Sequence, residues 1–321
     1  MSSSRLPEPF LKRLRSILEP GLYPSVLATF SEEKITTFRL NGLKGGDTES
    51  IKRLQDLGLN LEAVTGLENV WSVKHDQRGL LISSREFETG QIYVQNVSSM
   101  IPPMILEPEK KDRILDMTAA PGSKTLQLAE MVDKTGQIVA IEKVRNRFYK
   151  LKDNLQKNGA GFVKTFLGDG ERVWRRNMET FDRVLLDAPC STEGRFLEND
   201  PETYHYWSMR KVKEMVRKQS RLLFSAVQCL KPGGTLVYST CTFAPEENEG
   251  VIDRILQQFE GSLSIEEIGM PKGAKFTPGL TTWRNKRFNP EVERARRILP
   301  DHQFEGFFVC RIRKTSSTIG V

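Results

Sequence analysis

The chain has 321 residues, of which 38% are hydrophobic and 28% are charged, a balance typical of soluble globular proteins and a length sufficient for two domains. No apolar run approaches the length of a membrane span, and the N-terminus lacks the apolar core of a signal peptide, so no membrane association is expected. Four cysteines without CxxC spacing and three histidines outside any ligand pattern argue against disulfides and a metal, and predict a reducing, cytoplasmic setting. The net charge of +7 favours an anionic partner.

The first 90 residues mix helical and strand-like segments. A small amphipathic helix is predicted within residues 1–20, after a frayed start. A strand and turn follow at 34–43, an amphipathic helix at 48–59, and strand-like pieces at 63–73 and 79–84. We therefore predict a small α+β domain over residues 1–90.

From residue 113 onward, short and almost wholly apolar strands alternate with helices. This rhythm predicts an α/β fold with a doubly wound, mostly parallel sheet. The predicted strands are 113–117, 137–142, 163–167, 182–188, 234–240 and 306–313, and the predicted helices are 124–132, 145–159, 207–230 and 245–259. Ligands of such sheets bind beyond the carboxyl ends of the strands. That rim would carry Asp116, Glu142, Asp169, Asp187, Cys190 and Cys241.

The segment LDMTAAPGSKT at 115–125 reads as a strand, a loop of small residues and a helix. Ala119, Ala120 and Gly122 let the backbone approach a ligand closely, and the free N–H groups of the new helix suit a carboxylate. The loop is neither the GxGxxG of dinucleotide enzymes nor a complete phosphate loop.

Acidic residues end the next two strands. Glu142 can accept hydrogen bonds from a ribose diol, and Asp169 can reach an adenine amino group. The loop and the two acids together predict an adenosyl ligand without a phosphate cradle. S-adenosylmethionine fits, because its amino-acid end carries a carboxylate.

Two cysteines follow the ends of predicted strands, Cys190 in DAPCS and Cys241 in YSTCT. A thiolate that adds to carbon 6 of cytosine makes carbon 5 nucleophilic toward a methyl group, and a base must later remove the proton from carbon 5. Cys229 and Cys310 lie inside apolar runs, and we expect them in the core.

Three blocks, DMTAAPGSKT, LLDAPCSTEG and LVYSTCTFAPEENEG, resemble the signature motifs of the Nop/Sun RNA cytosine-5 methyltransferases, and 90–100 and 305–314 resemble flanking segments of that family. The combination of APGSKT with EGFFV is most similar to bacterial ribosomal-RNA members. The resemblance implies a Rossmann-like class I S-adenosylmethionine-dependent methyltransferase with a mostly parallel seven-stranded sheet over 91–315. It also implies a small N-terminal RNA-recognition-like domain, and it leaves 316–321 as a tail.

Residue roles follow by position from this resemblance. It implies that Cys241 is the nucleophile, that Cys190 assists product release, that Asp187 lies near the methyl group and the base, and that Lys124 orders the site. The implied cofactor-binding residues are Thr118, Ala119, Ala120, Pro121, Gly122, Ser123, Lys124, Glu142, Arg147, Asp169 and Asp187. Thr118 and Ser123 differ from the commonest family pattern, but both are small.

The implied reaction forms 5-methylcytosine in RNA, with small-subunit ribosomal RNA favoured and tRNA as an alternative. Two other readings remain: Cys190 as the nucleophile, against which the additional cysteine at 241 argues, and a non-catalytic RNA-binding ribosome-assembly factor. We expect a monomer.

Phosphate contacts are predicted from four basic clusters: Arg172, Arg175 and Arg176; Arg210, Lys211, Lys213, Arg217 and Lys218; Arg284, Lys286 and Arg287; and Arg294, Arg296 and Arg297. Trp174 and Trp283, next to these arginines, would either stack on bases or pack in the core.

Overall fold

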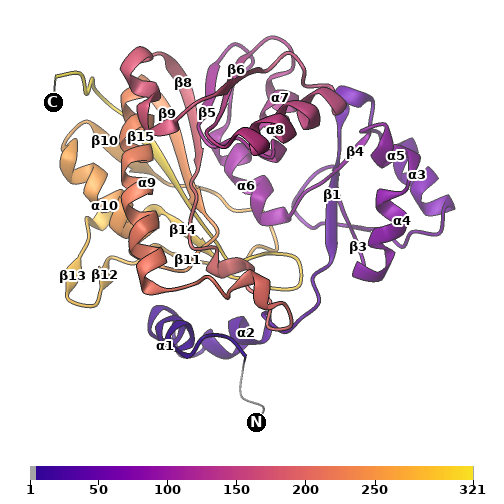
Figure 1. Cartoon of the computed structure of the whole chain (residues 1–321), viewed down its shortest axis with the longest axis horizontal. Coiled ribbons are helices and arrows are strands. Elements are labelled where there is room, and N and C mark those ends of the chain that lie inside the picture. Colours follow the sequence, from indigo (N-terminus) through magenta and orange to yellow (C-terminus); the bar gives the residue numbers. More distant parts are fainter. Residues whose placement is uncertain (1–4, 321) are drawn as a thin grey trace.

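The described part of the protein has a large β-sheet, a small one and a separate two-stranded hairpin (Figure 1). Helix α6 (Val97–Leu106) follows the last strand of the small sheet along the sequence and packs on the large sheet. The structure is a computed structural model that describes residues 5–320, so the predicted frayed start lies mostly outside the described residues. Within the described part, no helix is both long and apolar enough to cross a bilayer.

The small sheet has four antiparallel strands in the order β2-β3-β1-β4. Its strands are β1 (Thr36–Leu40), β2 (Glu62–Ala63), β3 (Val70–Val73) and β4 (Ile92–Val94), and its helices are α3 (Thr48–Asp56), α4 (Arg78–Ile82) and α5 (Arg85–Glu88). A capping box between Asp47 and Ser50 begins α3, because each side chain satisfies a free backbone N–H of the first turn. Strand β4 lies beyond residue 90, so the small sheet extends past the boundary that we predicted.

The segment 79–84 was predicted as strand-like, and this prediction is wrong. It forms α4, whose Leu81 is fully buried while Leu80 and Ile82 are exposed. A short apolar run has the same composition in either structure, so periodicity alone does not separate the two. The backbone turn that begins at His75 continues directly into this helix.

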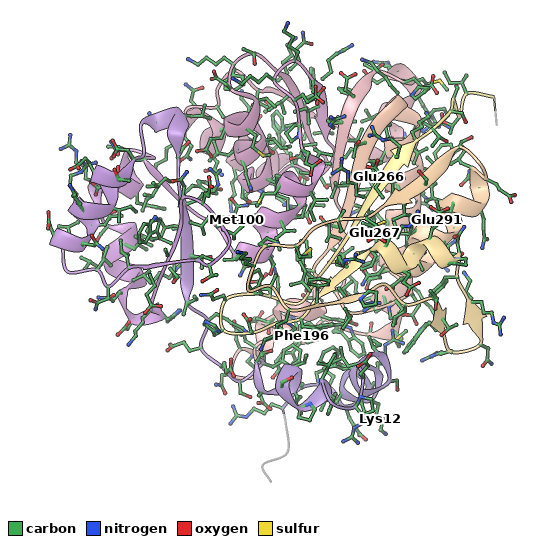
Figure 2. All side chains as sticks on the ribbon, turned by 180° about the vertical axis from the view of Figure 1, so that it is seen from behind. Lys12, Met100, Phe196, Glu266, Glu267 and Glu291 are labelled. Carbon is green, nitrogen blue, oxygen red and sulfur yellow. The ribbon has the colours of Figure 1, made fainter. Side chains whose placement is uncertain are left out.

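The two N-terminal helices, α1 (Glu8–Ile17) and α2 (Tyr23–Ala28), pack against the large domain and not against the small sheet (Figure 1). Phe10 on α1 is buried in edge contacts with Phe196 and Trp207. Figure 2 shows Phe196 facing these helices and Lys12 on their outer side. The predicted domain of residues 1–90 is therefore divided in space.

The large sheet has nine strands. Strands β7, β6, β5, β8 and β9 run parallel in that spatial order, and β15 lies antiparallel beside β9. Strands β10 and β14 both pair with the outer edge of β15, and β11 pairs with β14. The bounds are β5 (Arg113–Asp116), β6 (Gln137–Glu142), β7 (Lys164–Leu167), β8 (Phe181–Asp187), β9 (Leu230–Thr240), β10 (Leu263–Glu266), β11 (Phe276–Pro278), β14 (Arg296–Ile298) and β15 (Phe307–Lys314), with a separate hairpin of β12 (Thr282–Trp283) and β13 (Lys286–Arg287).

Seven of these strands form the sheet that the family resemblance implied, and β11 and β14 are short additions to it. These two strands escaped prediction because each has only three residues, and β10, with four residues, was not predicted as a strand either. The mostly parallel α/β architecture itself is as predicted.

Helices cover both faces of the large sheet (Figure 1). One face carries α6 (Val97–Leu106), α7 (Ser123–Val132) and α8 (Arg145–Lys157), and the other carries α9 (Met209–Cys229) and α10 (Glu249–Gln258). Successive strand residues alternate between the two cores: Leu185 packs with the first group of helices and Leu186 with the second. Cys229 and Cys310 are fully buried, as expected.

Helix α10 begins later than predicted. Residues 245–248 form a buried loop ahead of it, in which the side chain of Asn248 accepts a hydrogen bond from Thr240 at 2.6 Å. Acidic residues near a helix start favour the helix N-terminus, but tertiary hydrogen bonds hold these side chains in the core instead.

Candidate active site

The two cysteines predicted to carry chemistry meet at the carboxyl ends of β8 and β9. These parallel strands pair Asp187 with Ser239, so the loops that follow them begin side by side. The sulfur atoms of Cys190 and Cys241 lie 3.4 Å apart. Cys241 is half-buried and lines a cleft, whereas Cys190 is buried with 9% exposure.

The cleft has a volume of about 320 Å³ and lies at the rim where the sequence predicted a ligand. Eight predicted residues line it: Thr118, Ala120, Glu142, Arg147, Asp169, Asp187, Cys190 and Cys241. The adenosyl-side acids and the two thiols therefore share one hollow.

The two thiols differ in acidity. The hydrogen bond from Cys190, followed by the positive charge of Arg195, lowers the pKa of Cys241 against the opposing effect of burial. The same sulfur–sulfur contact, followed by burial, raises the pKa of Cys190 well above its usual value. Of the two, Cys241 is the thiol that becomes a thiolate more readily, and the thiolate is the nucleophilic form.

Asp187 is held by hydrogen bonds at the floor of the cleft. Lys124 donates to Oδ2 at 2.7 Å, and Ser239 donates to Oδ1 at 2.8 Å. The Lys124 ammonium also donates to the hydroxyl of Ser99 on α6 at 2.7 Å. This network fixes the carboxylate next to the cysteines.

The opposite wall carries the two acids assigned to the adenosyl group. Glu142 is buried and accepts a hydrogen bond from the backbone of Val144 at 2.8 Å. Lys143 donates a hydrogen bond to Asp169 at 2.8 Å. Burial alone would raise the pKa of Asp169, but this hydrogen bond and the other donors around the carboxylate lower it overall. Arg147 donates to the carbonyl of Ala120 at 2.6 Å and so ties α8 to the loop.

Part of the predicted loop does not face the cleft. Ala119, Pro121, Gly122, Ser123 and Lys124 are not on its wall, although Lys124 reaches the site through Asp187. Gly122 is required for a backbone reason, since its φ is +110°, a conformation that other residues rarely adopt.

Asp116 was predicted on the same rim, but it is 1% exposed and lies beneath the loop. It accepts a hydrogen bond from Thr125 at 2.7 Å, and burial raises the pKa of this carboxyl to about 6. It acts in the packing of the loop and does not line the cleft.

Several residues of the site were not predicted. The wall also includes Thr192, Arg195 and Leu222, and Ser99 and Ser239 support Lys124 and Asp187. Lys218, which was predicted only as a phosphate contact, lies on the wall as well. Ser99 lies in the segment 90–100 that carried the family resemblance, and Ser239 directly precedes the TCT motif. Thr192, Arg195 and Leu222 come from a loop and a long helix, and only the tertiary structure shows which of their residues face the cleft.

The predicted RNA-contact residues divide into exposed and internal ones. Arg297 is buried and forms an ion pair with Glu249 at 2.6 Å, so it stabilises the core and is not a phosphate contact. Trp174 is half-buried with its ring edge against Phe224, and the indole of Trp283 donates to Glu246 at 3.1 Å. Both tryptophans contribute to packing.

An open α/β sheet of this order, with acids and thiols at its carboxyl edge, defines a Rossmann-like methyltransferase. A solved structure described as a methyltransferase homolog protein from Pyrococcus horikoshii superposes with a TM-score of 0.76 at 31% identity, over 96% of this chain and 100% of that one. A second, NSun6 from Pyrococcus horikoshii, gives 0.83 at 21% identity, over 98% of this chain and 100% of that one, and shows the shared fold.

The family described as 16S rRNA methyltransferase RsmB/F matches residues 103–313, and the chain belongs to this family. A tRNA (cytosine(49)-C(5))-methyltransferase from Pyrococcus abyssi is 40% identical over 87% of this chain and 88% of its own length. The ribosomal RNA small subunit methyltransferase F of Serratia proteamaculans is 34% identical over 97% of this chain. The chain spans 64% of the length of that relative.

These findings confirm the predicted family and, at the level of the family, the predicted RNA cytosine-5 methyltransferase class. Among residues 5–320, no cluster of three or more histidine, cysteine or acidic side chains is arranged to hold a metal ion.

Proposed function

We propose that this chain methylates carbon 5 of a cytosine in RNA, with Cys241 as the nucleophile. The observation that carries the proposal is the position of Cys241: its half-buried sulfur opens into the cleft that Glu142 and Asp187 also line, 3.4 Å from a second thiol. A thiol used only for packing would be sealed in the core, as Cys229 is.

The cleft fits S-adenosylmethionine. Its volume of about 320 Å³ lies within the usual range for a small-molecule site. Glu142 supports a ribose, because each of its carboxylate oxygens keeps a lone pair beyond its contacts with Val144 and Arg147. Thr118 and Ala120 would face the amino-acid end, and Asp169 the adenine. When bound, S-adenosylmethionine supplies the methyl group that carbon 5 takes.

The protein's own groups divide the work on the cytosine. The Cys241 thiolate forms a bond to carbon 6, which makes carbon 5 nucleophilic. Asp187, oriented by Lys124 and Ser239, lies where it can bind the polar edge of the base. After methylation, a proton acceptor removes the hydrogen from carbon 5 as a proton. The bond between carbon 6 and the Cys241 sulfur then breaks, and Cys190 assists this release.

Ribosomal RNA of the small subunit is the substrate that we favour, because the matching family is described as a 16S rRNA methyltransferase and a relative aligned over 97% of this chain is named a ribosomal RNA small subunit methyltransferase. Transfer RNA is the second candidate, supported by the 40% identity to the Pyrococcus abyssi enzyme. We further propose that the small N-terminal domain contacts RNA and that the protein works in the cytoplasm as a monomer, without a metal.

Methyl transfer from labelled S-adenosylmethionine tests this function directly. The purified protein is incubated with small ribosomal subunits, with protein-free 16S rRNA and with unmodified tRNA, and bisulfite sequencing maps the product. We expect label at carbon 5 of a defined cytosine in one of these RNAs. Binding of RNA without any label in all three would favour the non-catalytic assembly factor.

A further inference from the structure

Beneath the two cysteines lies a buried chain of four side chains that the proposed reaction does not use. Glu247, Ser191, Thr242 and Glu193 are each at most 2% exposed. The Ser191 hydroxyl contacts Oε1 of Glu247 and lies 2.8 Å from the Thr242 hydroxyl, which in turn lies 3.0 Å from Oε2 of Glu193. Ser191 follows Cys190 directly, and Thr242 follows Cys241.

This row of hydrogen-bonded side chains lacks one hydrogen if both acids are charged. The three contacts between the two carboxyl groups each need one hydrogen, and the two hydroxyls supply two. The third hydrogen must sit on one of the carboxyl groups. Two buried carboxylates that share a site in this way cannot both be charged without a large cost.

The surroundings show which acid carries the hydrogen. Both oxygens of Glu193 accept an N–H, one from the Trp207 indole at 2.9 Å and one from the Phe243 backbone at 3.1 Å. Glu247 receives its N–H donors on Oε2 alone, from the Ser191 backbone at 3.0 Å and from Gln219 at 2.7 Å. Within residues 5–320, Oε1 of Glu247 meets only the Ser191 hydroxyl, so a proton there conflicts with no other donor.

We propose that Glu247 holds a buried proton on Oε1 and is a positioning residue, whose hydrogen-bonded chain through Ser191 and Thr242 to Glu193 fixes the distance between Cys190 and Cys241. The inference rests on the proposed function only for its catalytic consequence.

The loop that carries Cys190 is tightly packed at Gly194. A Cβ atom added to this glycine would lie 2.0 Å from the carbonyl oxygen of Gly306.

The charges around Glu247 agree with this assignment. Burial, followed by the charge of Glu193, raises the pKa of Glu247 to about 8, so it is protonated at neutral pH. The other titratable groups nearby are Cys190, the Tyr238 hydroxyl, which donates to the Glu247 carbonyl at 2.7 Å, and Arg13 with its partner Glu246, which face Glu193. Removal of the proton would break one hydrogen bond of the chain and place a negative charge near Cys190.

Amide variants test the asymmetry between the two acids. Glu247→Gln keeps a donor toward Ser191, and we expect its kcat within about threefold of wild type. Glu193→Gln turns an amide nitrogen toward existing donors, and we expect kcat to fall about 10²-fold at an unchanged KM for S-adenosylmethionine, the usual effect of a misplaced catalytic group. Glu202→Gln, on an exposed acid of the following loop, is the matched control. Equal loss in both amide variants, with both still folded by circular dichroism, would overturn the proposal.

A pH profile and neutron diffraction give readouts that a purely structural role would not move. We expect the kcat of wild type to fall above about pH 8 as Glu247 ionises, and Glu247→Gln to lack that fall. Neutron diffraction of deuterated crystals at neutral pH should show a deuteron on Oε1 of Glu247, and a deuteron on Glu193, or on neither acid, would refute the assignment. Because diffraction needs no activity, it separates this proposal from the proposed function, which fails if wild type transfers no methyl group.

Discussion

At the scale of single side chains, the reactivity of Cys241 depends on the charge around its sulfur. Arg195 lines the same cleft and lowers the pKa of this thiol, after the larger effect of the Cys190 hydrogen bond. Arg195→Gln should therefore shift the rise of covalent RNA adduct formation to higher pH, since the thiolate then forms later. The shift is measured by quenching the reaction after a fixed time at a series of pH values and quantifying the covalent RNA adduct. Arg15→Gln, at an exposed residue of α1, is the control. An unchanged midpoint in Arg195→Gln would show that Arg195 has no such role.

Asp187 lies at the centre of a second prediction at this scale. Its carboxylate balances the nearly buried ammonium of Lys124 and accepts from Ser239. We expect Asp187→Asn to lower kcat by about 10²–10³-fold, the usual cost of removing one positioned polar contact to the reacting group. Ser239→Ala, which leaves the ion pair intact, should lose much less. A similar kcat for Asp187→Asn and wild type in the labelled-methyl assay would remove Asp187 from the mechanism.

At the scale of elements, helix α1 supports the loop that carries Cys190. Phe10 is 1% exposed and has edge contacts with Phe30, Phe196 and Trp207. Phe10→Ala should lower the free energy of unfolding by about 3–5 kcal/mol, because the cavity left in this aromatic cluster cannot close fully. Urea denaturation measures the decrease, and Lys12→Ala on the outer side of the same helix is the control (Figure 2). A decrease below about 1 kcal/mol in Phe10→Ala would mean that α1 packs loosely.

The elements also show which parts of the fold were predictable. Strand β6 spans the predicted residues 137–142, because its apolar pattern is local and its neighbours repeat the same rhythm. The start of α10 was wrong, because Glu247 and Asn248 serve tertiary hydrogen bonds that no local pattern encodes. The rim residues Glu142, Asp187, Cys190 and Cys241 were found because strand ends of a parallel sheet share one edge. Arg195 and the Glu247 chain were missed because they depend on how two loops meet.

At the scale of the whole molecule, the net charge of +7 gives RNA binding a measurable signature. Exposed basic residues of α9, among them Lys213 and Arg217, precede Lys218 on the cleft wall. Removing one cation that binds a phosphate should reduce the slope of log affinity against log salt by about 0.7–0.9. Affinity titrations of Lys213→Ala and Arg217→Ala at several salt concentrations measure the change. Lys52→Ala, on the surface of α3 and paired with Glu49, is compared with them. Slopes equal to wild type in both α9 variants would place the RNA elsewhere.

The proposed mechanism depends above all on which of the two thiols bonds to the cytosine, and trapping of the RNA adduct answers that question. Cys190→Ala and Cys241→Ala proteins are each incubated with substrate RNA and S-adenosylmethionine, separated under denaturing conditions and mapped by mass spectrometry. We expect Cys190→Ala to accumulate RNA covalently attached to Cys241, and we expect Cys241→Ala to form no adduct. An adduct on Cys190 in the Cys241→Ala protein, with none in Cys190→Ala, would show that Cys190 is the nucleophile.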